Sequence, residues 1–74
     1  MMMEDSAAVG LMLEEATREL ESAIHDARVA FDCISLGEID RAHTSAVTAR
    51  IAIDAAVTAV QAALNQAPRT APGS

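Results

Sequence analysis

At 74 residues the chain makes one small domain with a hydrophobic core of marginal size, and 17 of its hydrophobic residues are alanines. Its single aromatic residue, Phe31, argues against β-sandwiches, small barrels and proteins that stack on nucleobases. Eleven acidic residues against five arginines give a net charge of −6. Because clustered positive charge binds phosphate backbones and anionic lipid surfaces, we expect neither a nucleic acid nor a membrane as a partner.

Residues 1–5 are predicted to be a flexible N-terminus. They read Met-Met-Met-Glu-Asp, without the basic and apolar regions of a secretory signal peptide. The single cysteine, Cys33, cannot form an internal disulfide, which is typical of reducing compartments. We therefore expect a cytoplasmic protein, or one of the host cytoplasm if a phage encodes it.

The first predicted helix covers about residues 6–35. Its apolar residues are spaced alternately by four and three positions, which is the pattern of one face of a helix. The polar residues lie off this stripe, and Glu14 and Arg18 are spaced to pair across one turn. The stripe contains Val9, Leu13, Ala16, Leu20, Ala23, Ala27, Ala30 and Ile34.

A turn is predicted near Gly37, because glycine readily adopts the left-handed conformation that ends many helices. A second helix follows over about residues 38–66, and so short a link forces the two helices to be antiparallel. Residues 67–74, which include two prolines, are predicted to be a disordered tail. The stripe of the second helix contains Ile39, Ala42, Ala46, Ala49, Ile53, Ala56, Val60, Ala63 and Ala67.

Alanine recurs every seven residues at one position of each stripe. Small side chains in such a row allow two helices to approach closely. The alternative is that alanine, a strong helix former, is simply abundant. The pattern predicts an all-α fold, an antiparallel two-helix hairpin packed along its alanines, with larger residues at the other core position. The alanines are Ala16, Ala23 and Ala30, then Ala42, Ala49, Ala56 and Ala63, and the larger residues are Leu13, Leu20, Ile34, Ile39, Ile53 and Val60.

Two helices cannot cover all of this apolar surface, because further large residues widen each stripe. Small domains without disulfides or metals commonly solve this problem by oligomerising. We therefore expect a homodimer in which two hairpins form a four-helix bundle; the alternative is that the stripe docks onto another protein. The predicted helix-packing interface comprises Leu13, Ala16, Leu20, Ala23, Ile24, Phe31, Ile34, Ile39, Ala42, Ala49, Ile53, Ala56, Val57, Val60 and Leu64.

Residues that could carry chemistry are few. Asp40 and His43 have the carboxylate–histidine spacing of di-iron bundles, but they lie at the helix start and off the stripe, which favours a solvated pair. His25 falls on the outward side of the first helix, and Cys33 is expected to act as a small core residue. No nucleophile, base and orienting acid stand together. We expect no enzymatic activity, no cofactor and no metal.

These patterns predict a non-enzymatic protein–protein interaction module, a small homo-oligomeric hairpin that binds itself and another protein. The alternative is a small acidic inhibitor or adaptor, such as a phage- or plasmid-type anti-defence protein, that binds a larger host complex. Small size, acidity and the lack of catalytic residues suit this alternative.

Overall fold

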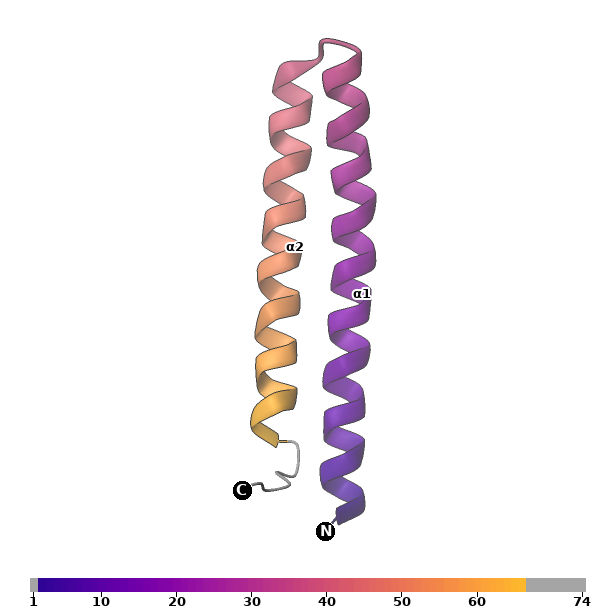
Figure 1. The fold of residues 1–74 in the computed structure, drawn as a ribbon, viewed down its shortest axis with the longest axis vertical. Coiled ribbons are helices and arrows are strands. Elements are labelled where there is room, and N and C mark those ends of the chain that lie inside the picture. The colour runs from indigo at the N-terminus through magenta and orange to yellow at the C-terminus, as the bar shows by residue number, and fades with distance from the viewer. Residues whose placement is uncertain (1, 67–74) are drawn as a thin grey trace, which may run out of the picture.

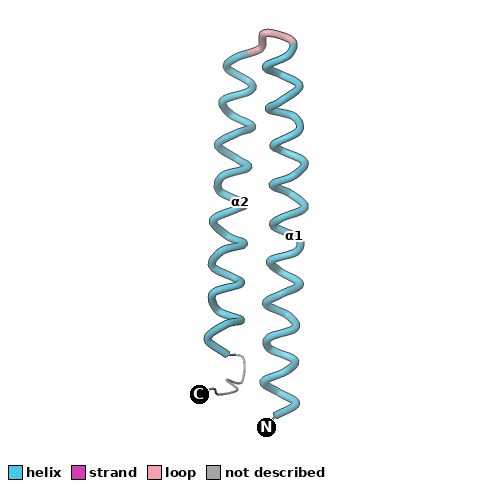
Figure 2. Tube along the Cα trace, viewed as in Figure 1, coloured by secondary structure: helices cyan, strands magenta, loops and turns pink. Residues whose placement is uncertain are grey.

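A computed structural model of the chain describes the backbone of residues 2–66 and the side chains of residues 7–66. Two α-helices, α1 (Met2–Ser35) and α2 (Ile39–Gln66), lie side by side and run antiparallel (Figure 1). Within residues 2–66, only the short connection at one end is not helical (Figure 2). The chain measures 53 × 24 × 13 Å, so it is a rod one helix thick. The predicted all-α hairpin is confirmed.

The helix bounds differ slightly from those expected. Helix α1 begins at Met2, so residues 2–5, expected to be flexible, belong to the helix. No glycine or proline interrupts this segment. Helix α2 begins at Ile39. The predicted tail, residues 67–74, lies outside the described residues.

The turn is built around Gly37, as predicted. Its φ of 78° lies in the left-handed region, where an L side chain is strained. The N–H of Glu38 donates to the Cys33 carbonyl at 2.8 Å, and the N–H of Gly37 donates to the Ile34 carbonyl at 3.0 Å. These two bonds form a Schellman motif, which satisfies the last carbonyls of α1. The Glu38 carbonyl then accepts from the Ala42 N–H at 3.0 Å and starts α2.

Small side chains fill the space between the two helices. None of the buried residues between residues 7 and 66 is larger than cysteine. An alanine side chain is a single methyl group, so the backbone of the neighbouring helix can approach closely. The distance between the helix axes can then lie at the short end of the usual range of about 8–10 Å. We call these buried residues the alanine seam: Ala16, Ala23, Ala30, Cys33, Ala42, Ala52, Ala56 and Ala63.

The second position of each predicted stripe does not lie in this seam. In α1 the residues that take this second position instead are Met12, Glu19, Asp26 and Cys33, each buried or half-buried and each one residue before the predicted Leu13, Leu20, Ala27 and Ile34. In α2 they are Ser45, Ala52 and Ala59, each one residue before the predicted Ala46, Ile53 and Val60. The expectation that leucine and isoleucine share the hairpin core is thereby corrected. Large side chains at that position would hold the backbones apart and break the alanine contacts.

Candidate protein-interaction surface

Ten large apolar residues that were predicted to pack helices lie on the outside of the hairpin. Their exposed fractions run from 38% for Val60 to 70% for Phe31. In each helix they occupy positions next to the buried alanines, on the side turned away from most charged residues. We call them the aliphatic face: Leu13, Leu20, Ile24, Phe31, Ile34, Ile39, Ile53, Val57, Val60 and Leu64.

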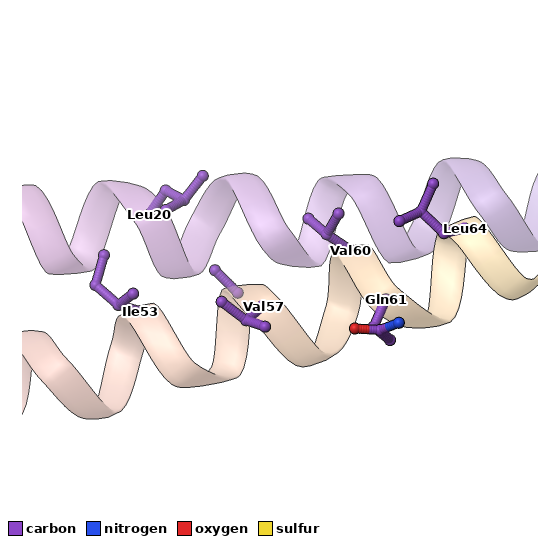
Figure 3. Close-up of a pocket in the computed structure, with 7 residues that line it drawn as sticks. Leu20, Ile53, Val57, Val60, Gln61 and Leu64 are labelled. Carbon is purple, nitrogen blue, oxygen red and sulfur yellow. The ribbon is translucent and has the colours of Figure 1, made fainter.

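Residues of both helices join in this face. Leu20 of α1 lines the same groove as Ile53, Val57 and Leu64 of α2, as Figure 3 shows. The antiparallel arrangement therefore places the apolar flank of α1 beside the apolar flank of α2. The face is continuous across the helix boundary rather than a separate stripe on each helix.

The aliphatic face is large for a chain of this size. Its exposed fractions correspond to roughly 1,000 Å² of apolar surface, whereas the largest patch on a typical monomer is about 300–600 Å². Each partner of a stable protein–protein complex contributes about 800 Å². The face alone thus provides enough surface for a specific interface.

A groove of about 250 Å³ crosses the part of the face that lies away from the turn (Figure 3). Ala56, a member of the alanine seam, forms its floor, being only 3% exposed. We call it the aliphatic groove. Gln61 is its one polar residue, and its full lining is Leu20, Ile53, Ala56, Val57, Val60, Gln61 and Leu64.

The turn half of the face has a different shape. Phe31 is the most exposed residue of the aliphatic face. With Ile24 and Ala27 it lines an open hollow of about 530 Å³ that Arg28 and Asp32 border on the outer side of α1. Both halves are therefore hollowed. The turn half carries the most exposed ring beside a hollow that two charged residues border, whereas the groove of the other half has apolar lining residues apart from Gln61.

The opposite side of the hairpin carries both charged and apolar residues. A hollow of about 490 Å³ is lined there by Leu11, Met12, Glu15, Ala55, Thr58, Ala59 and Ala62. Arg18 Nη2 donates to Glu15 Oε1 at 2.6 Å, so the arginine pairs with Glu15 and not with the expected Glu14. The hydrogen bond from Arg18, together with its charge, lowers the pKa of the Glu15 carboxyl, and the same contact raises the pKa of Arg18. Both groups are exposed, so this pair adds little stability.

The residue types that can carry chemistry stay dispersed. Asp40 and His43 are both exposed on the first turns of α2, and His25 is exposed on α1. Cys33 is 5% exposed within the seam, where it acts as a small core residue, as predicted. Among the described residues, no group of three or more His, Cys, Asp or Glu side chains could hold a metal ion. That the protein binds no metal stays a prediction, which elemental analysis tests.

The fifteen predicted interface residues thus divide into two sets. Five alanines lie between the helices, four of them buried and Ala49 half-buried, and the other ten form the aliphatic face. The sequence-based prediction missed Ala52, which is 5% exposed and lies one residue before the predicted Ile53. A row of small residues at positions 45, 52 and 59 was the available signal, and it was masked by the more hydrophobic row beside it.

Helix α2 also has the length and composition of a membrane-spanning helix. It has 28 residues, and its apolar window of 18 residues reaches a mean hydropathy of 1.4, with 22% of that window buried. Core helices of soluble proteins pass the same test, so this single helix is weak evidence for a membrane. A cytoplasmic location stays a prediction.

Comparison of the chain with protein-family models, with curated proteins and with solved structures finds no match. The function must therefore be argued from the geometry of the hairpin, above all from the aliphatic face and its groove.

Proposed function

We propose that this chain is a non-enzymatic protein–protein interaction module that self-associates through its aliphatic face into a four-helix bundle. The observation that carries the proposal is the distribution of side-chain size. The alanine seam uses the smallest apolar residues to join the helices of one hairpin, and ten large apolar residues remain exposed on one side.

The energetic argument favours a partner on that side. Burying a large aliphatic side chain contributes about 1.5–3 kcal/mol, and the single hairpin leaves these side chains largely in water. Stable domains are built from two packed layers around one core, whereas this rod is 13 Å thick, the width of one helix layer. A second hairpin on the aliphatic face would supply the missing layer.

The charges of the face agree with self-association. A net charge of −6 on each copy opposes contact between copies unless the acidic residues lie elsewhere. No Asp or Glu occurs at the helix positions of the face, and the two ionisable residues that share these positions, His43 and Arg50, carry no negative charge. Two copies can therefore meet there without burying a carboxylate.

Sedimentation equilibrium at micromolar concentration tests the proposal. We expect a species near 15 kDa, twice the chain mass of 7.7 kDa. Val57→Gln places a polar group on the aliphatic face and should raise the dissociation constant at least about tenfold, since it removes roughly 1.4 kcal/mol or more of burial. Thr58→Gln alters the neighbouring residue on the opposite side and should leave the dissociation constant unchanged.

A strongly helical wild-type monomer of 7.7 kDa would contradict self-association. The aliphatic face would then have to bind a different protein, as in the inhibitor or adaptor alternative. Equal effects of Val57→Gln and Thr58→Gln would place the interface somewhere other than the aliphatic face.

A further inference from the structure

We infer that the two hairpins of the bundle are antiparallel to each other, so that Phe31 of each copy packs into the aliphatic groove of the other. This inference rests on the self-association proposed above and adds the orientation of the copies and the residue that anchors them. It follows from the unequal shape of the two halves of the aliphatic face.

Phe31 and the aliphatic groove lie at opposite ends of the face. Phe31, 70% exposed, is six residues before Gly37 at the turn, whereas the groove extends from Leu20 and Ile53 to Leu64 near the open end of the hairpin. An exposed aromatic ring and a groove with an apolar lining complement each other. They can meet only if one hairpin is reversed with respect to the other.

The spacing along the rod supports the same arrangement. Because the turn is centred on Gly37, residues at equal distances from it lie level, and Leu13 is level with Val60 and Gln61. When two reversed copies overlap along the whole face, the two-fold axis passes near residue 22 of α1. Phe31 of one copy then lies at the level of Leu13 in the other, beside Val60 and within the groove.

The parallel arrangement uses the same surface less well. Both turns would then lie at one end, with Phe31 of each copy facing the turn half of the other. Each ring would then meet the hollow that the charged Arg28 and Asp32 border, and the two grooves, of about 250 Å³ each, would face each other without a Phe31 ring in either. Unfilled apolar space forfeits contacts, whereas the antiparallel arrangement repeats one ring-in-groove contact twice about the two-fold axis.

Distance measurement between spin labels tests the orientation. In the full-length chain, Cys33→Ala removes the native thiol, and Ser35→Cys places one label on an exposed position at the end of α1. In the antiparallel dimer, the two labels are separated by about 26 helical residues, or about 40 Å. A distance below about 25 Å, the width of a four-helix bundle, would show the parallel arrangement and overturn the inference.

The same measurement separates failure of the inference from failure of the proposed function. A single distance, short or long, requires that copies associate. Absence of any dipolar coupling at micromolar concentration would show that the chain is monomeric, which overturns both.

A double-mutant cycle tests the ring-in-groove contact itself. Phe31→Ala should weaken the dimer at least about 100-fold, because each dimer loses two rings. Within one chain, Phe31 and Val60 lie about 25 Å apart along the rod, so the effects of Phe31→Ala and Val60→Ala should multiply unless the residues meet across the interface. We expect the dissociation constant of the double variant to be at least about fivefold lower than the value that the two single effects, multiplied, would give.

Leu11→Ala is the matched control, because Leu11 is 66% exposed but lies on the opposite side. It should change the dissociation constant less than about threefold and combine with Phe31→Ala without coupling. Independent effects of Phe31→Ala and Val60→Ala would overturn the ring-in-groove contact.

Discussion

The alanine seam and the aliphatic face differ in the size of their side chains and in their exposure to solvent. Every buried residue of the seam is an alanine or Cys33, whereas the aliphatic face carries Leu, Ile, Val and Phe at 38–70% exposure. Small residues allow two backbones to approach and gain many short dispersion contacts. Large residues supply the apolar surface that drives association. The hairpin uses its small residues for internal packing and leaves its large apolar residues exposed.

This comparison also explains why the hairpin has little core of its own. A buried alanine removes far less apolar surface from water than a buried leucine, and the contribution scales with the area removed. A seam of alanines gives precise helix placement with little hydrophobic stabilisation. The hairpin and its association should therefore be energetically linked, as in other small domains that oligomerise.

The largest expected effect comes from enlarging the seam. Ala56→Leu adds bulk at a residue that is 3% exposed and should lower the free energy of unfolding by about 1–3 kcal/mol through overpacking. Ala49→Leu should cost less, because Ala49 is only half-buried. Thermal unfolding followed by circular dichroism measures both.

Thr58→Leu is the control for these variants, since Thr58 is exposed and outside the seam. It should be nearly neutral, within about 0.5 kcal/mol. Unchanged melting of Ala56→Leu would show that the close approach of the helices does not depend on the alanines.

Replacing Gly37 or Gly10 with alanine should change the stability of the hairpin in opposite directions. Gly37→Ala forces an L side chain into the left-handed turn at φ 78° and should destabilise the hairpin by about 1–2 kcal/mol, even though no atom lies within 4 Å of the new Cβ. Gly10→Ala lies in the middle of a helix with open space around the new Cβ and should stabilise by about 0.5–1 kcal/mol. Denaturant titration of both variants measures the difference. A harmless Gly37→Ala would mean that the turn does not fix the register of the seam.

A smaller effect is expected from the ion pair between Glu15 and Arg18, on the side of the hairpin opposite the aliphatic face. The pKa of Glu15 is lowered by Arg18, so the pair stabilises the fold above the ordinary carboxyl pKa of 4.5, and this contribution is lost as the pH falls through the lowered value. Glu15→Gln should lower the melting temperature slightly at pH 7 and not at all at pH 2. A difference between variant and wild type that persists at pH 2 would show that Glu15 acts through packing and not through its charge.

The smallest expected effect is that of metal removal. Asp40 and His43 are exposed, and we expect no stoichiometric Fe, Mn or Zn in the purified protein and no change in melting temperature after chelation. Elemental analysis checks this directly. A tightly bound ion in each dimer would move the functional centre from the aliphatic face to the start of α2 and reopen the question of enzymatic activity.

Much of this architecture follows from local patterns. The seven-residue recurrence of Ala16 and Ala23 predicted a seam position that the structure confirms, with exposed fractions of 4% and 3%. Gly37 predicted the turn, because few other residues tolerate a positive φ. Helical spacing identified all ten residues of the aliphatic face as packing residues. It did not predict that they lie on the outside of the hairpin.

The sequence by itself determined two helices, their antiparallel order and one row of the seam, because helix periodicity and turn chemistry are local properties. The tertiary structure decided which neighbouring row completes the seam. Two rows one residue apart fit the same period, one with Leu20 and Ile53 and the other with Glu19 and Ala52. Hydrophobicity favours the first row, but the second row is the one that lies between the helices, with Ala52 buried and Glu19 half-buried. Close packing of the backbones thus prevails within the hairpin, and the larger apolar residues lie exposed on its outer face.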